Sequence, residues 1–136
     1  MATSATFSSG VATVRAQILP ADTTAWKDVY DNSAGTKAVR IEGLGITSDD
    51  TSTVNIQFSM LASAVNYNIG TARAVTLSGT DGAAAKVNAL TSIGTLAPDG
   101  IYDIWVGAGE KLQAKSLVTV TSAKTVAITG RARLYA

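Results

Sequence analysis

The sequence has 136 residues, the usual size of one domain, with 46% apolar residues, 15% charged residues and a net charge of +1. It contains no cysteine and no histidine, which excludes disulfides, thiol nucleophiles, Ser-His-Asp triads and histidine-ligated metals. Charges of both signs are scattered along the chain, so the clustered basic face that nucleic acid requires is missing. We therefore expect a structural or binding protein, with no enzymatic activity, no cofactor, no metal and no nucleic-acid partner.

The N-terminal segment, residues 1–10, is small and polar apart from Phe7. Because it has too few apolar groups to pack on its own, we predict a flexible arm that becomes ordered when Phe7 binds a pocket on a neighbour. The segment lacks the basic and apolar regions of a secretory signal, and no stretch approaches the roughly 20 apolar residues of a membrane span. We expect synthesis in the cytoplasm, no membrane partner, and one domain over residues 11–136.

Strands are predicted along most of this domain, because Thr, Val and Ile are abundant and their β-branched side chains favour a pleated surface. Period-two alternation predicts strands, in chain order, over residues 11–18, 25–30, 37–47, 53–60, 67–77, 101–106, 111–120 and 125–135. The alternation is clearest over residues 53–60, where Ile56 and Phe58 share one face. Gly43 and Gly45 predict a bulge or corner inside the third strand. Residues 83–90 fit a helical turn as well as a strand.

Turn-forming residues separate the predicted strands, because Gly supplies positive φ and Asp and Asn bond their own backbone. These turns are expected at residues 32–35, 48–51, 81–82, 98–100 and 107–109. Many short strands without a long helical period indicate an all-β fold, a β-sandwich of two sheets. The number of strands suits a jelly roll, with an immunoglobulin-like sandwich as the alternative.

The chemically interesting carboxylates have simpler structural interpretations. Asp49 and Asp50 could contribute to a loose Ca²⁺ site, but we interpret them as a solvated turn. Asp99 and Asp103 are interpreted as turn and edge charges. The Gly-rich segment over residues 107–111 lacks the full spacing of a phosphate-binding loop, and we predict a hairpin turn there.

The aromatic residues are the best candidates for contacts with a partner. Trp26 and Tyr30 are predicted to share one face of a short strand, either as a second core layer or as an exposed anchor pair. The same two alternatives apply to Trp105 and Tyr135, whereas Phe58 is assigned to the core. The candidate partner-binding residues are Phe7, Trp26, Tyr30, Trp105, Arg131, Arg133 and Tyr135.

Four segments carry a resemblance to a known class of proteins: AQILPADTT over residues 16–24, ITSDDT over 46–51, GAGEKL over 107–112 and VTSAKTV over 120–126. Together they resemble small structural proteins encoded near the head genes of tailed bacteriophages, including head decoration or cement proteins with a jelly-roll fold. The resemblance implies a virion protein, made in the host cytoplasm, that binds the outer surface of the assembled head. It implies that the protein bridges neighbouring major capsid subunits, and we expect it to act there as a dimer or trimer. No functional residue carries over from the resemblance.

Two alternatives from other functional classes remain open. One is a tail, baseplate or fibre β-module that binds a host glycan, for which an exposed aromatic platform is expected. The other is a small enzyme that uses carboxylates, which would require a pocket enclosing two acidic residues from the set Asp49, Asp50, Asp99, Asp103 and Glu110.

Overall fold

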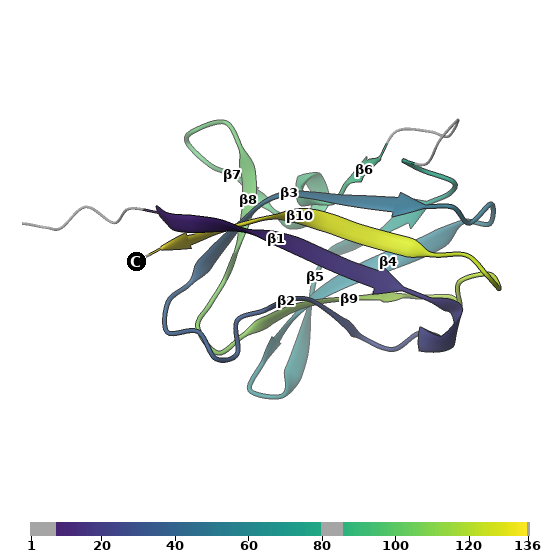
Figure 1. The fold of residues 1–136 in the computed structure, drawn as a ribbon, viewed down its shortest axis with the longest axis horizontal. Helices are drawn as coiled ribbons and strands as arrows, with labels where there is room; N and C mark the ends of the chain where they lie inside the picture. Colours follow the sequence, from purple (N-terminus) through teal and green to yellow (C-terminus); the bar gives the residue numbers. More distant parts are fainter. Residues whose placement is uncertain (1–7, 80–85, 136) are drawn as a thin grey trace, which may run out of the picture.

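The computed structural model describes residues 8–79 and 86–135, which form two antiparallel sheets packed face to face (Figure 1). The strands are β1 (Ser8–Ile18), β2 (Lys27–Asp31), β3 (Val39–Ser48), β4 (Val54–Ala62), β5 (Val65–Val75), β6 (Val87–Asn88), β7 (Thr95–Leu96), β8 (Tyr102–Val106), β9 (Lys111–Ser116) and β10 (Val126–Tyr135). A 3-10 turn, η1 (Pro20–Asp22), and a single helical turn, α1 (Leu90–Ile93), complete the described elements. Neither is long and apolar enough to cross a membrane.

The strand order identifies the topology. The first sheet has the order β1-β10-β3-β8-β7, with β6 paired to β3, and the second sheet has the order β2-β9-β4-β5. When the two-residue strands β6 and β7 are set aside, the long strands of both sheets follow the double Greek key of a jelly roll. The predicted fold class, an all-β two-sheet sandwich of jelly-roll type, is therefore confirmed.

The core lies between the two sheets and follows the period-two pattern of the sequence. Ile56 and Phe58 of β4 have no exposed surface, and they belong to the same core cluster as Ile41 and Ile46 of the first sheet. Burial of such side chains is the main force that holds the two layers together. Phe58 is the largest fully buried side chain, and we expect it to contribute most to that force.

A bulge interrupts β3 at the predicted glycines. Thr129 of β10 pairs with Gly45 and Arg131 pairs with Glu42, so β3 holds one extra residue at this point. Gly43 takes a φ of +64°, a conformation that side chains other than glycine rarely adopt. Leu44 is consequently buried in the core, at 1% exposure. The predicted bulge is confirmed.

Each predicted strand has an observed counterpart, but the ends differ. The strand predicted from residue 11 begins at Ser8, so residues 8–10 belong to β1 and pair with the end of β10. Phe7 and the rest of the predicted arm, residues 1–7, lie outside the described residues. The strand predicted over 111–120 ends at Ser116, and the next residue, Leu117, donates its N–H to Asn55.

The turn over residues 107–109 is not the hairpin that the sequence predicts. It joins β8 of the first sheet to β9 of the second. Asn32 holds the chain in this crossing between the sheets. Its buried side-chain amide donates to the carbonyl oxygens of Val106 and Gly107 at 3.2 and 3.0 Å. Its backbone carbonyl accepts from the Gly109 N–H at 3.0 Å. A residue predicted only as a turn former thus holds the crossing between the two sheets.

Asp50 corrects a second prediction, since it is not part of a solvated turn. Its side chain has no exposed surface and accepts hydrogen bonds from the backbone N–H and hydroxyl of Thr121, at 2.8 and 2.9 Å, and from the N–H of Ser52. Burial alone would raise the pKa of Asp50, but these hydrogen bonds outweigh it and hold the pKa below its usual value. The carboxylate therefore ties the β3–β4 connection to the loop before β10.

Candidate functional site

The register of the first sheet places a row of large side chains on its outer face. Val11 of β1 pairs with Arg133 of β10, Arg133 pairs with Arg40 of β3, and Arg40 pairs with Trp105 of β8. Their neighbours along the strands are buried in the core or pack against it, so the row faces away from the second sheet. We call this surface the Trp105 face; it consists of Val11, Arg40, Trp105, Arg131, Arg133 and Tyr135.

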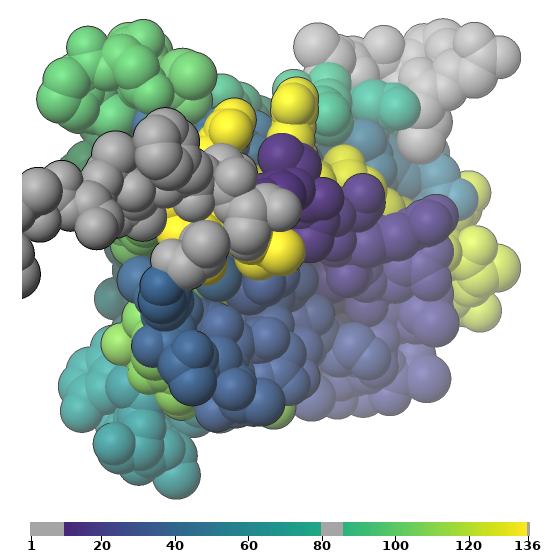
Figure 2. Space-filling view, turned by 60° about the vertical axis from the view of Figure 1, so that its left-hand side comes forward, coloured from purple at the N-terminus to yellow at the C-terminus, as the bar shows by residue number. Residues whose placement is uncertain are grey.

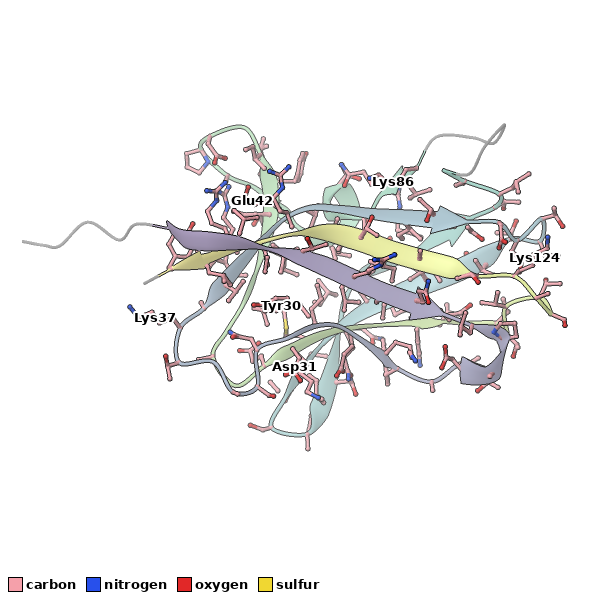
Figure 3. The ribbon with its side chains drawn as sticks, in the orientation of Figure 1. Tyr30, Asp31, Lys37, Glu42, Lys86 and Lys124 are labelled. Carbon is pink, nitrogen blue, oxygen red and sulfur yellow. The ribbon has the colours of Figure 1, made fainter. Side chains whose placement is uncertain are left out.

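An ion-pair cluster forms the centre of the Trp105 face. Arg40 contacts three carboxylates, through Nε to Asp103 at 2.6 Å, through Nη2 to Asp99 at 3.0 Å and through Nη1 to Glu42 at 3.5 Å. Arg133 donates from Nε to Glu42 at 2.5 Å. Figure 3 shows Glu42 on the side of the first sheet that faces outward. We call these five residues the Arg40 cluster.

The structure corrects the interpretation of Asp103 as an edge charge. The residue is only 5% exposed, and it lies on β8 directly opposite Glu42 of β3, inside the sheet. Asp99 matches its prediction as a turn charge more closely, because it lies in the exposed β7–β8 turn. Both carboxylates nevertheless bind the same guanidinium, which the sequence interpretation did not anticipate.

All resolved pKa shifts in the Arg40 cluster favour the charged forms. The hydrogen bond from Arg133 lowers the pKa of Glu42 and outweighs its burial, and the backbone N–H of Ile101, followed by Arg40, lowers the pKa of Asp99. Burial opposes the charge on Arg40, but the bonds to Asp103 and Asp99 outweigh it and raise the pKa of Arg40. The resolved shifts therefore hold Glu42, Asp99 and Arg40 in their charged forms.

Two aromatic rings flank the Arg40 cluster. Trp105 and Tyr135 stack with their ring centres 5.5 Å apart and an angle of 22° between the planes. Trp105 remains 48% exposed. Stacking fixes both rings without covering them, which prepares a rigid apolar surface for contact with another molecule.

Trp105 lies between two shallow hollows. The first, of about 520 Å³, is lined by Arg40, Thr95, Leu96, Ala97, Pro98, Asp99, Asp103 and Trp105. The second, of about 380 Å³, is lined by Lys37, Ala38, Trp105 and Tyr135. The β7–β8 hairpin, which supplies one wall of the first hollow, projects from the body of the molecule in Figure 2. We call the first hollow the Asp99 hollow.

The remaining predicted site residues are separated from one another. Tyr30 packs against the core between the sheets, where Figure 3 also shows it, whereas Trp26 lies on the outer face of the second sheet with the Lys115 Nζ 4.5 Å from its ring centre. The prediction that Trp26 and Tyr30 share a face was wrong, because the pairing of β2 with β9 shifts register between Asp28 and Tyr30.

The outer face of the second sheet carries a different kind of polar surface. The Asn66 amide donates to the Ser59 hydroxyl and to the Gln113 carbonyl oxygen, both at 2.7 Å, and the Gln113 amide donates to Asp28 at 2.7 Å. The Lys111 Nζ lies 3.2 Å from Oδ2 of Asp28 and forms an ion pair with it. We call this surface, formed by Asp28, Ser59, Asn66, Lys111 and Gln113, the amide face; its side chains bind one another through hydrogen bonds and an ion pair.

Sequence reasoning missed the Arg40 cluster as a functional element. The available signal was the alternation of Arg40 and Glu42 at the outward positions of one strand and of Arg131 and Arg133 at those of another. Opposite charges on two alternating strands indicate neighbours in a sheet. Within residues 8–79 and 86–135, no three acidic side chains converge in a way that could hold a metal ion.

Among known proteins, the chain is similar to a solved structure. No protein-family model matches the chain, and no curated protein matches it. The crystal structure of a pentameric capsid protein isolated from metagenomic phage sequences is similar, with a TM-score of 0.42 and 20% sequence identity over 90% of this chain. The chain spans 59% of that protein.

Proposed function

We propose that this chain is a structural virion protein that binds the outer surface of a phage capsid and cements neighbouring major capsid subunits. The observation that carries the proposal is the Trp105 face, where Trp105, Tyr135, Arg131 and Arg133 gather on one side of a jelly roll. The resemblance of four sequence segments to head decoration proteins supports the same function.

The chemistry of the Trp105 face suits contact with another protein. Tryptophan, tyrosine and arginine are the residues that contribute most often to the binding energy of protein interfaces. Here Trp105 is held by stacking, and the guanidinium of Arg133 is held by Glu42, so little side-chain freedom is lost on binding. Preorganised side chains of this kind favour a lasting contact over a transient one.

Cementing follows from mass action on a symmetric shell. A protein that binds only the assembled capsid shifts the equilibrium toward assembly, and many identical copies add their modest contacts together. The proposed partners are the major capsid protein and further copies of this chain, as a dimer or trimer on the shell. We further propose that residues 1–7, which precede β1, act as an arm with Phe7 as its anchor, and that the protein has no enzymatic activity.

The test is retention of purified protein on undecorated heads, measured by sedimentation, together with the resistance of those heads to heat and osmotic shock. We expect binding and increased resistance with the natural sequence, and loss of both with Trp105→Ala. Trp26→Ala is the matched control, because it removes the other tryptophan from the opposite face. Heads that neither retain the protein nor gain resistance would contradict the proposal.

A second candidate function is favoured by one specific observation. The Trp105–Tyr135 stack is exposed beside a hollow with two carboxylates, and sugar rings bind on aromatic faces with polar groups at their edges. A tail, baseplate or fibre module that binds a host glycan would use the same surface. Binding to a glycan array, lost in Trp105→Ala, together with no retention on heads, would favour this function over cementing.

A further inference from the structure

The Asp99 hollow has an excess of negative charge. The carboxylates that line the hollow itself are Asp99 and Asp103, against the single guanidinium of Arg40. The hollow is therefore complementary to a cation.

The hydrogen-bond donors around the hollow are already used, whereas some of its acceptors are not. Each terminal nitrogen of Arg40, and its Nε, already contacts a carboxylate, so Arg40 offers little to an anionic ligand. In contrast, Oδ1 of Asp103 accepts no hydrogen bond from any residue in the described parts of the chain, and the Asp99 side chain is 47% exposed. The free capacity of the hollow is thus for accepting hydrogen bonds.

The wall of the hollow provides a second attraction for a cation. The exposed indole of Trp105 lines it, and an indole face attracts an ammonium or guanidinium group within about 6 Å of the ring centre. The molecule itself uses this contact on its other face, where Lys115 lies over Trp26 at 4.5 Å. Leu96, at 60% exposure, offers an apolar surface for the methylene stem of a long side chain.

From these observations we propose that the Asp99 hollow receives a basic side chain, an arginine or a lysine, from the partner protein. The side chain lies against the Trp105 indole and its charged end binds Asp99 and Asp103. Arginine suits the site better, since its planar group can stack on the indole and present two N–H donors to a carboxylate at once. This inference rests on the proposed function, because it names the partner chemistry at the same face.

The first experiment uses peptides as probes, with the full chain carrying Trp26→Phe, so that Trp105 is the one tryptophan left. Its fluorescence is titrated with acetyl-Gly-Arg-Gly-amide, with the matched Glu peptide and with methyl glucoside. We expect a saturable change with the Arg peptide alone, and an affinity lowered about threefold or more by Asp99→Asn. Asp31→Asn is the matched control, an exposed carboxylate on the second sheet. Equal responses to the Arg and Glu peptides, a response to the sugar alone, or no response would overturn the inference.

The second experiment separates the inference from the proposed function, using retention on undecorated heads. If heads retain the natural protein and Asp99→Asn equally well, the cation site is wrong although cementing stands. If heads retain neither while the peptide titration shows the expected selectivity, cementing is wrong although the cation site stands. Thermal unfolding of Asp99→Asn should match that of the natural sequence, which excludes loss of fold as the reason for weaker binding.

Discussion

The two outer faces of the sandwich differ in how their polar groups are paired and in what they leave exposed. On the Trp105 face, charged groups are paired across three strands and leave an exposed indole and a hollow beside them. On the amide face, Asn66 and Gln113 bridge their neighbours, and no exposed aromatic stack stands beside them among the residues that the structure describes. Both faces cover the same core.

The difference indicates which face is prepared for a partner. Hydrogen bonds on the amide face join Asn66, Gln113 and Asp28 to one another, so a ligand that used these amides would have to break them. The Trp105 face keeps unused acceptor capacity and a large exposed ring, while its ion pairs hold the surrounding side chains in place. We infer that the amide face stabilises the sheet, whereas the Trp105 face both stabilises and binds.

Loss of the shared core should weaken both faces together and have the largest effect. We expect Phe58→Ala to lower the free energy of unfolding by about 3–5 kcal/mol, because it leaves a cavity between the two sheets. Urea unfolding followed by the fluorescence of single-tryptophan variants, Trp26→Phe and Trp105→Phe, reports on each face separately. If the unfolding transitions reported by Trp26 and by Trp105 occurred at different urea concentrations, the two faces would not share one core, which would contradict the account.

Removal of Arg40 should have the next largest effect and act on one face. In Arg40→Met the nearly buried carboxylates of Asp103 and Glu42 lose a cationic partner, and we expect a loss of about 3 kcal/mol. The measurement is urea unfolding at neutral pH, with Arg15→Met as the control on the exposed edge of the same sheet. A cost no greater than that of the control would show that the cluster does not stabilise the face.

Acid should weaken the Trp105 face through Glu42. The folded pKa of Glu42 lies below its usual value, so its contribution is fully present above the unfolded pKa, about 4.3, and is lost as the pH falls through the folded pKa. Unfolding free energies measured between pH 7 and pH 3 should therefore fall less steeply in Glu42→Gln than in the natural sequence. Parallel pH profiles for the two proteins would contradict this assignment.

Substitution on the amide face should lower the free energy of unfolding least. Gln113→Ala removes the link between Asn66 and Asp28, and we expect a loss of about 1 kcal/mol, as for an ordinary hydrogen-bonded side chain. The same variant should leave the Arg-peptide titration of Trp105 unchanged. A loss as large as that of Arg40→Met would remove the contrast between the two faces.

The fold was predictable because its main determinant is local. Alternation over residues 53–60 and 125–135 reports which side chains face the core, and the glycines at 43 and 45 indicate the bulge in β3. The jelly-roll order is not local, and it came from the number of strands and the resemblance to phage proteins. Strand ends do not follow from the alternation, since they depend on contacts such as the hydrogen bond from the Leu117 N–H to the Asn55 carbonyl.

The candidate site was predictable only in part, for reasons of register. The shared face of Arg131, Arg133 and Tyr135 follows from alternation, whereas Trp105 could be core or interface from the sequence, and nothing in the sequence states that β8 and β10 flank β3. The bond between Arg40 and Asp103 joins residues 63 positions apart and depends on the exact pairing of two strands. The register shift in β2 and the loop contacts of Asp50 escape sequence reasoning for the same reason.

The docking role of the Trp105 face is tested most directly by hydroxyl-radical footprinting of the protein bound to undecorated heads. Each outer face carries one tryptophan, so oxidation of Trp105 and Trp26 can be compared in the same sample. We predict that binding protects Trp105 and Tyr135 and leaves the oxidation of Trp26 unchanged. Protection of Trp26, with Trp105 as reactive as in the free protein, would contradict the account.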